Sequence, residues 1–455
     1  MKGLLTLVVA ALFAAGCSNA SAVSEPAVID FNVTDKTASE VVMVVRNDIR
    51  NISLDQDGKG QIVLEGYDAA YARIFYGMDF KWVYFEKGDR AVVSFKGNDF
   101  KGSFEFEGQK AQAVDYLNTI KLTALPDEDY ALPFEEYLAK IKVKEQDAVK
   151  LMKANGLRSA GNFEKMETAR IKYAYGAPLL MHSIGHAMMT GNMEYKPDAG
   201  YYKVIDSYLE DEAMLASLDE YCSFAVEAAH VLDEANRNVK ALYPKTVAQM
   251  RFIAGRFNDV KLRNALLHYL AAPYVDSFGT ADIQELENIY RTYVKDEALV
   301  ADFEAKIDKW NVSMPGKPSP ALSAADIDGK EWTLADFKGK YVYIDMWATW
   351  CAPCKRELPY LKELEKRFAG ADIVFLGLSV DADKAKWEEM VRSGKLTGVQ
   401  LYLGAQSRFQ KAYNVDGIPR FILLDKEGII ISNDMSRPSA KETAETLRNL
   451  EGIRL

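Results

Sequence analysis

Cysteine is scarce in this sequence of 455 residues, which contains only Cys17, Cys222, Cys351 and Cys354. Four cysteines are too few to hold a fold together through disulfides, so packing must stabilise the protein. Only one C-x-x-C pair is present, and a structural zinc site usually needs a second pair of ligands. The single pair therefore indicates redox chemistry, and we expect no metal site.

Clustered basic residues are also missing. The formal net charge is −10, and no long run of Lys and Arg occurs. Because clustered positive charge is what binds a phosphate backbone, this composition argues against a nucleic-acid partner. Hydrophobic residues make up 49% of the chain, which is enough for ordinary globular cores. At this length we expect two or three domains.

Residues 1–22 have the features of an export signal. Lys2 supplies a positive charge, and residues 4–15 form an apolar stretch that is too short to span a bilayer. Residues 14–17 (Ala-Ala-Gly-Cys) are similar to a bacterial lipobox, in which the cysteine is lipidated. We expect a periplasm-facing protein of the cell envelope, anchored to the membrane through Cys17. The alternative is a plain secretory signal that is cleaved a few residues farther on.

Two segments of different composition follow this signal. Residues 25–122 contain β-branched and aromatic runs at 41–45 and 82–85, and they predict a small antiparallel β-sandwich. Residues 130–311 are rich in Glu, Lys, Ala and Leu, with apolar residues at three- and four-residue steps. This second pattern predicts a helical domain.

A proline-rich stretch at 313–320 marks the next domain boundary. From residue 312 to 455, the expected strands and helices alternate in the order β-α-β-α-β-β-α. Apolar runs at 341–347 and 373–380 have the character of buried strands. The order predicts an α/β domain whose central sheet is covered on both faces.

The pair Cys351 and Cys354 lies where the first of these strands ends and a helix begins. A helix start offers unpaired N–H groups and the positive end of the helix dipole, which both favour a thiolate. We expect the pKa of Cys351 to fall from about 8.5 toward the ~3.5–7.5 range of such motifs. Cys351 is then the attacking sulfur, and Cys354 resolves the mixed disulfide. Pro353 suits the helix start because it has no N–H to leave unpaired.

The segment W-C-A-P-C-K at 350–355 resembles a thioredoxin active site, and the surrounding domain is similar to the TlpA/ResA group of bacterial envelope thioredoxins. The resemblance implies a thioredoxin-like fold in which a cis-proline, here Pro419, faces the dithiol. It also implies that Ile418 and Pro419 bind the partner's extended backbone. We assign Trp350 and Pro353 to the same substrate-binding surface. Cytochrome c maturation and repair of exported proteins are the settings that such relatives suggest.

Two acidic residues complete the predicted catalytic group. Asp345 stands six residues before Cys351, which matches the buried acid that handles the second cysteine's proton in thioredoxins. Glu357 stands three residues after Cys354 and matches the acid that ResA-like proteins keep beside their dithiol. A buried carboxyl has a raised pKa and can exchange a proton near neutral pH. We expect Asp345 or Glu357 to deprotonate Cys354 during resolution.

Three other residues could carry chemistry. His182 and His186 are four residues apart and would share a helix face, a spacing that can bind zinc. The glutamate of an H-E-x-x-H motif is missing, so we expect helix-surface or core histidines. Cys222 lies in a helical stretch and is expected to be a buried free thiol.

Together these features predict an enzyme that reduces protein disulfides by thiol–disulfide exchange. The dithiol is the only redox group expected, without a separate cofactor, and a membrane thiol–disulfide donor would resupply its electrons. An oxidase or isomerase would use the same atoms in the opposite direction, since direction depends on reduction potential. A third interpretation is a partner-binding lipoprotein with an auxiliary redox domain, in which residues 25–310 recognise a partner or form a homo-oligomer.

Overall fold

The computed structural model describes residues 25–46, 48–157, 161–280 and 282–453. These residues divide into two compact units. The first unit contains the described residues up to Asn238 together with Phe257–Leu262. The second contains Val239–Arg256 and the described residues from Arg263 onward, so the helices between 130 and 311 are shared between the two units.

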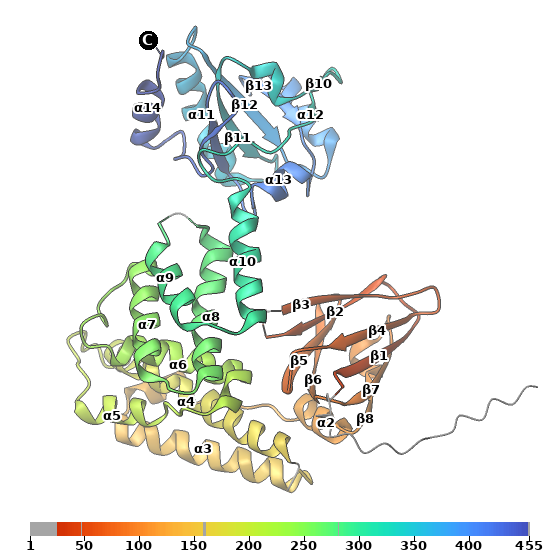
Figure 1. Cartoon of the computed structure of the whole chain (residues 1–455), viewed down its shortest axis with the longest axis vertical. Coiled ribbons are helices and arrows are strands. Elements are labelled where there is room, and N and C mark those ends of the chain that lie inside the picture. The colour runs from red at the N-terminus through yellow and green to blue at the C-terminus, as the bar shows by residue number, and fades with distance from the viewer. Residues whose placement is uncertain (1–24, 47, 158–160, 281, 454–455) are drawn as a thin grey trace, which may run out of the picture. The chain divides into compact units, whose positions relative to one another are not determined.

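The first unit begins with eight strands and two short helices (Figure 1). They are β1 (Ala27–Thr34), β2 (Glu40–Val45), β3 (Asp48–Ser53), β4 (Lys59–Leu64), β5 (Ala69–Tyr76), β6 (Asp79–Glu86), β7 (Arg90–Lys96), α1 (Phe100–Ser103), β8 (Glu105–Gly108) and α2 (Ala111–Thr119). The strands form two four-stranded sheets with the orders β4-β1-β7-β8 and β3-β2-β5-β6. Buried residues of both sheets, such as Phe31 and Ile74, belong to one hydrophobic cluster.

The strand pairing of this unit corrects one expectation. An antiparallel module is predicted, yet β1 and β7 are parallel, with Val28 opposite Arg90 and Thr34 opposite Lys96. Parallel neighbours need a long crossover between them, and β2–β6 supply it here. Alternation of buried and exposed residues, as in β7, is the same for either direction of pairing. The sequence pattern therefore could not reveal this direction.

Helices make up the rest of the first unit. They are α3 (Phe134–Ala154), α4 (Asn162–Thr190), α5 (Ala199–Ser207) and α6 (Asp219–Leu232), with the short 3-10 helices η1 (Asp127–Ala131) and η2 (Ala213–Ser217). Glu167 of α4 is completely buried and binds Arg170 through both carboxylate oxygens, at 2.7 and 2.8 Å. It also accepts a hydrogen bond from the hydroxyl of Tyr71 on β5 at 2.9 Å. This contact joins the helices to the sheets within the unit.

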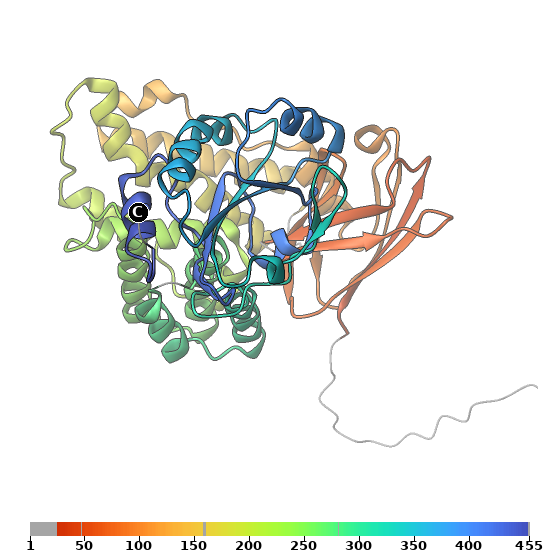
Figure 2. The same cartoon turned by 90° about the horizontal axis from the view of Figure 1, so that it is seen from above.

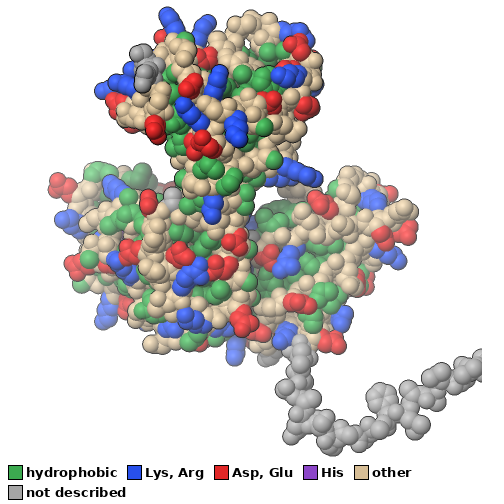
Figure 3. Space-filling model, turned by 45° about the horizontal axis from the view of Figure 1, so that its top comes forward, with side chains coloured by type: hydrophobic (Ala, Val, Ile, Leu, Met, Phe, Trp, Pro, Cys, Tyr) green, Lys and Arg blue, Asp and Glu red, His purple; other side chains and the backbone are tan. Residues whose placement is uncertain are grey.

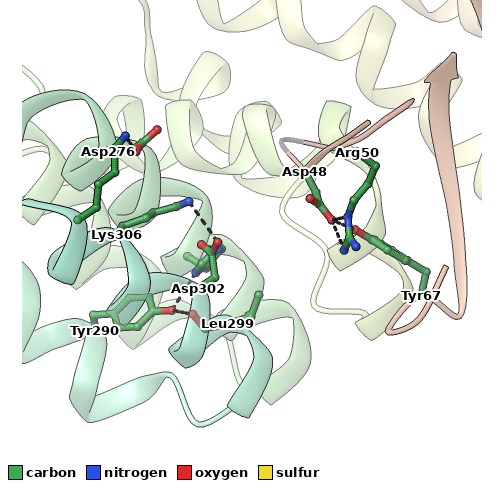
Figure 4. A network of polar contacts seen from close by, with 10 residues as sticks. Asp48, Arg50, Tyr67, Asp276, Tyr290, Leu299, Asp302 and Lys306 are labelled. Carbon is green, nitrogen blue, oxygen red and sulfur yellow. Dashed lines mark hydrogen bonds and ion pairs between the residues drawn. The ribbon is translucent and has the colours of Figure 1, made fainter. Parts of the chain in front are cut away.

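A smaller polar contact stabilises the edge of one sheet. Asp48 of β3 accepts hydrogen bonds from Arg50 at 2.7 Å and from the hydroxyl of Tyr67 at 3.1 Å (Figure 4). Burial, together with the charge of Asp48, raises the pKa of Tyr67 to about 12. The phenol therefore stays protonated and keeps donating its hydrogen bond throughout the neutral range.

The second unit opens with four helices, α7 (Leu242–Arg256), α8 (Val260–Phe278), α9 (Gln284–Tyr293) and α10 (Glu297–Asn311). Tyr290 of α9 donates to the carbonyl of Leu299 on α10 at 2.9 Å (Figure 4). Asp302 lies 3.2 Å from the ring of His268 and 3.1 Å from the ammonium of Lys306. The hydrogen bond with His268, followed by Lys306, holds the pKa of Asp302 below its usual value. These contacts hold α8, α9 and α10 together.

The C-terminal part of the second unit is an α/β domain (Figure 1). Its elements are β9 (Ala324–Ala325), β10 (Glu331–Trp332), η3 (Leu334–Phe337), β11 (Tyr341–Trp347), α11 (Ala352–Arg367), β12 (Ile373–Ser379), α12 (Lys384–Arg392), β13 (Val399–Tyr402), α13 (Arg408–Ala412), β14 (Arg420–Leu424), β15 (Ile430–Ser432) and α14 (Lys441–Arg448). The seven strands have the order β10-β9-β13-β12-β11-β14-β15. β11, β12 and β13 are parallel, and β14 is antiparallel to β11.

Helices cover both faces of this sheet, as predicted, and the strands lie between them in both views (Figures 1 and 2). On one face, Ile344 and Met346 of β11 belong to a cluster with Trp387 of α12 and Phe409 of α13. On the other face, the alternate residues of β11 pack with α11 and α14. β11 is buried along its whole length because it is central and covered twice.

No helix among the described residues is both long and apolar enough to cross a membrane. On the face seen in Figure 3, acidic and basic side chains are intermixed over the described surface. Such mixing limits the long-range attraction that this face exerts on a strongly charged partner.

Candidate active site

The two cysteines of the C-x-x-C pair meet at the junction of β11 and α11. β11 ends at Trp347, and Cys351 is the N-cap residue of α11. Cys351 and Cys354 form a disulfide with an S–S distance of 2.02 Å and a Cα–Cα distance of 5.3 Å. The first turn of the helix thus places the predicted pair in bonding contact.

The first turn of α11 also directs its backbone at the sulfur of Cys351. The Sγ atom accepts a hydrogen bond from the N–H of Cys354 at 3.2 Å. Pro353 occupies the helix start, where its missing N–H costs nothing. A donor aimed at the sulfur and the positive end of the helix dipole both favour negative charge there. The helix start can therefore support a thiolate once the disulfide is reduced.

The segment around Ile418 and Pro419 faces the dithiol. The peptide bond between these residues is cis, and the carbonyl oxygen of Ile418 lies 3.7 Å from Sγ of Cys351. Cys351 and Cys354 are only 3% and 2% exposed, whereas Trp350 beside them is 68% exposed. A partner must bring its sulfur to a nearly buried disulfide, and Trp350 offers that partner an apolar contact.

Asp345 lies on β11 and is almost completely buried. Tyr343, two residues earlier on the same face, packs in a cluster with Leu361 of α11, so the carboxyl of Asp345 also points under this helix. Burial, followed by the charges of Glu357 and Glu365, raises the pKa of Asp345 to about 7. A carboxyl with this pKa can both take up and release a proton near neutral pH.

Glu357 lies on the buried face of α11, one turn after Cys354. Its Oε2 accepts a hydrogen bond from the backbone N–H of Ser439 at 3.0 Å, and its Oε1 accepts one from the hydroxyl of Ser439 at 3.1 Å. Ser439 lies 82 residues along the chain, just before α14. Each oxygen of Glu357 thus has a fixed donor, which orients the carboxylate and ties α11 to the C-terminal segment.

Asp381 is a residue of this site that sequence reasoning missed. It is 1% exposed, just after β12, and it accepts hydrogen bonds from the N–H of Thr349 at 3.0 Å and from its hydroxyl at 2.7 Å. The hydroxyl of Ser379 donates to it at 2.8 Å. Asp381 therefore positions the residues that lead into Cys351. A signal existed, because the carboxyl ends of neighbouring parallel strands meet at one edge of a sheet.

Comparison with known proteins adds to this geometry. Residues 314–450 match the Redoxin family model. Thiol-disulfide oxidoreductase ResA of Geobacillus thermodenitrificans is 31% identical over 136 residues, which cover 29% of this chain and 78% of that protein. The chain belongs to the ResA-like thiol–disulfide oxidoreductases.

Other proteins match the same part of this ResA-like protein. Thioredoxin-like protein YneN of Bacillus subtilis is 29% identical over 162 residues, which cover 35% of this chain and 86% of YneN. A solution structure of a proposed thiol-disulfide oxidoreductase from Bacteroides vulgatus is 54% identical in sequence to this chain, with a TM-score of 0.29. The match covers 30% of this chain and 92% of the chain in that structure. The residues that match the Redoxin family model, 314–450, belong to the C-terminal third of the chain.

The remaining predicted residues of this ResA-like protein belong to the first unit or lie outside the described part. Cys17 lies outside the described residues. Cys222 is a buried free cysteine, as predicted, and burial raises its pKa to about 12. His182 and His186 contact the backbone carbonyls before α3, with Nε2 of His182 3.0 Å from the oxygen of Leu132. Among the described residues, no three His, Cys, Asp or Glu side chains are grouped to hold a metal ion.

Proposed function

We propose that this ResA-like protein reduces disulfide bonds of other proteins in the cell envelope. The thiolate of Cys351 attacks one sulfur of the partner's disulfide, forms a mixed disulfide and releases the other partner sulfur as a thiolate. Cys354 then gives up its proton, and its sulfur attacks Sγ of Cys351. The bond between Cys351 and Cys354 forms, the mixed disulfide breaks, and the partner leaves with two more electrons.

Asp345 is the proposed acceptor of the proton from Cys354. It is buried on the strand beneath α11, and its pKa of about 7 suits exchange at neutral pH. Glu357 is placed one turn from Cys354, but each of its oxygens already accepts a hydrogen bond from Ser439. We therefore assign proton transfer to Asp345 and orientation of the helix to Glu357.

The observation that favours reduction over oxidation is this pair of buried carboxyl groups, Asp345 and Glu357. A neighbouring negative charge destabilises a thiolate, so these acids oppose the helix dipole at Cys351. Strong oxidants of the superfamily owe their high potential to a stabilised reduced form. The two basic residues that follow Cys354, Lys355 and Arg356, are exposed and largely screened by solvent. The reduced form of the dithiol is therefore not strongly stabilised relative to the disulfide, which favours donation of its electrons.

A redox titration of the dithiol in the full chain tests this direction. We expect a midpoint potential near that of thioredoxin, about −270 mV, and not near the about −120 mV of a strong oxidant. The Asp345→Asn variant should titrate at a less negative potential because it lacks a charge that opposes the thiolate. A wild-type potential near about −120 mV would support the oxidase alternative instead.

The partner is proposed to bind across Trp350, Pro353, Ile418 and Pro419. Trp350 is exposed, and the carbonyl oxygen of Ile418 lies 3.7 Å from Sγ of Cys351. A Cys354→Ser variant cannot resolve the mixed disulfide, so it should hold the partner covalently through Cys351. The double variant that also lacks Cys351 is the matched control and should retain nothing.

The location of the reaction is proposed from the signal at residues 1–22. A lipid on Cys17 would anchor the protein at the membrane, where a membrane thiol–disulfide donor would reduce Cys351–Cys354 again. No redox cofactor besides this dithiol is needed in the cycle. Labelling of cells with a radioactive fatty acid should mark the wild-type chain and leave the Cys17→Ser variant unmarked. An unlabelled wild-type chain would point to a plain secretory signal.

Partner binding by the first unit is a second proposed role, favoured by a groove of about 730 Å³. We take the two N-terminal sheets as a β-sandwich that carries this groove. Phe80 and Trp82 of β6 line it together with Leu117 of α2, and Lys81 and Lys121 add positive charge. An extended segment with acidic and apolar side chains would complement this lining.

A charge-reversal variant tests this binding role. Lys81→Glu combined with Lys121→Glu should slow reduction of the trapped physiological partner and leave reduction of a small aromatic disulfide unchanged. Equal rates for the partner in both proteins would remove the groove from the proposal.

A further inference from the structure

Asp345 begins a row of three residues that crosses the sheet beneath α11. It lies opposite Gly377 of β12, and Gly377 lies opposite Gln400 of β13. Neighbouring strands are about 4.8 Å apart, and residues opposite each other project to the same face. The side chains of Asp345 and Gln400 therefore share the face that α11 covers, with no side chain between them.

The carboxamide of Gln400 fills the space over Gly377. A Cβ atom on Gly377 would lie 2.3 Å from Oε1 and 2.7 Å from Nε2 of Gln400, closer than atoms can pack. Nε2 donates to the carbonyl of Thr397 at 2.6 Å. The side chain of Gln400 thus extends across β12 in the direction of Asp345, and the glycine is what permits this.

Three buried oxygen atoms along this layer have no hydrogen-bond partner among the described residues. They are Oδ1 of Asp345, Oε1 of Gln400 and Oε1 of Glu365. Glu365 lies on α11, and its Oε1 is 2.8 Å from the position that a Cβ on Gly398 would take, just before β13. A buried acceptor without a donor costs about 1–3 kcal/mol. A proton on the carboxyl of Asp345 or of Glu365 would provide a hydrogen-bond donor within this layer.

The charge of one acid in this layer acts on the other. The charge of Glu365 adds to burial and Glu357 in raising the pKa of Asp345. Burial also raises the pKa of Glu365, against a side-chain hydrogen bond with Thr397 and the opposite charge of Lys362 on the same helix. Tyr343, the other ionisable neighbour of Asp345, has its pKa raised by burial and stays neutral. Glu365 is partly exposed, whereas Asp345 is buried, so Glu365 lies nearer to solvent than Asp345 does.

We propose that Glu365 carries the proton of the resolution step between Asp345 and solvent, along the layer that contains the Gln400 amide. The proposal rests on the proposed function, in which Asp345 deprotonates Cys354. As Cys354 attacks Sγ of Cys351, the new S–S bond forms and the departing partner sulfur keeps the electron pair of the broken bond. The proton moves from Cys354 to Asp345, then to Glu365, and from there to water.

Release of thionitrobenzoate from a mixed disulfide preformed on Cys351 of the full chain measures the attack by Cys354. We expect Glu365→Gln to slow this release about tenfold near neutral pH, a fraction of what a complete acid–base catalyst contributes. The remaining pH dependence should move to lower pH, because the lost charge no longer raises the pKa of Asp345. Glu363→Gln, an exposed acid on the same helix, is the matched control and should behave as wild type.

Two further variants distinguish proton transfer through Glu365 from a purely structural effect of its replacement. Gln400→Leu, which keeps the volume but removes the amide, should slow release as Glu365→Gln does. In an Asp345→Asn background, Glu365→Gln should cause no additional slowing, since both groups serve one path. A Glu365→Gln rate equal to the control, or added slowing in the double variant, would overturn the relay alone. An unchanged rate in Asp345→Asn itself would overturn the proton transfer of the proposed function as well.

Discussion

At the scale of single residues, the properties of Asp345 come from burial. Its carboxyl is 3% exposed, and no described residue places an opposite charge against it. Burial is the main cause that raises its pKa to about 7, with the charge of Glu357 second. The same burial that suits Asp345 to its proposed role as a proton acceptor therefore costs folding free energy at neutral pH.

Asp345→Asn should stabilise the C-terminal domain above neutral pH. The carboxyl has a pKa of about 3.9 when unfolded, so between this value and about 7 only the folded state binds the proton. Wild-type stability therefore falls as pH rises through this window. At pH 8, the variant should gain up to about 4 kcal/mol in free energy of unfolding, and the gain should vanish below about pH 4. Urea unfolding of both proteins at the two pH values measures it, and a pH-independent difference would contradict it.

At the scale of elements, two buried carboxylates hold segments in place for the site and for the first unit. Asp381 binds the loop between β11 and α11 through both polar groups of Thr349. Glu167 joins α4 to β5 through the hydroxyl of Tyr71, while Arg170 on the same helix pairs with its charge. In each case the anchoring residue is distant in sequence from its target, and the donors that satisfy it would be left unpaired without it.

Asp381→Ala should loosen the residues before Cys351. Removal of a buried acceptor leaves the N–H and hydroxyl of Thr349 without a partner, which should cost about 2–4 kcal/mol in free energy of unfolding. Reaction of the reduced protein with a small disulfide should slow, because residues 348–350 no longer hold the attacking sulfur in place. Asp416→Ala removes an exposed acid and serves as the control. Unchanged kinetics in Asp381→Ala would limit Asp381 to stability.

Glu167→Gln should destabilise the first unit. The change leaves the buried guanidinium of Arg170 with only Glu220, at 3.4 Å, as its acidic partner. Loss of one member of a buried ion pair typically costs about 3–5 kcal/mol. Thermal unfolding followed by circular dichroism should show one transition moved to lower temperature, while exchange of Cys351 with a small disulfide continues. An unmoved transition would show that the pair is not structurally required.

At the scale of the whole molecule, the redox chemistry uses a minority of the chain. The family match covers residues 314–450, and the C-terminal domain contains its own hydrophobic clusters on both faces of its sheet. The first unit has a separate cluster that belongs to its two sheets. The matched domain and the two N-terminal sheets therefore each have a hydrophobic core of their own.

The segment 312–455 alone should reduce a small aromatic disulfide as fast as the full chain does. The same segment should reduce the physiological partner, identified by trapping on Cys354→Ser, more slowly than the full chain. Parallel rate measurements with the two substrates test this difference. Equal rates with the physiological partner would remove the recognition role from residues 25–310.

The fold of the C-terminal domain was predictable because its signals are local. Alternating apolar runs and helical stretches indicated an α/β domain, and the C-x-x-C pair indicated the strand-to-helix junction. The predicted order omits the short elements β9, β10 and α13. The cis peptide before Pro419 and its place beside Cys351 were implied by family resemblance and are present. The parallel pairing of β1 and β7 was not predictable, since alternation does not encode strand direction.

The sequence by itself determined which two sulfur atoms come into contact. Two cysteines one turn apart at a helix start must be close together, whatever the rest of the chain does. Only the tertiary structure decided which groups lie around the buried carboxyls and hold the site in place. Ser439 meets Glu357 across 82 residues, and Gln400 reaches over Gly377, because strand pairing and helix packing bring them together. Local spacing cannot specify contacts of that range, so the proposed proton path depends on the folded sheet.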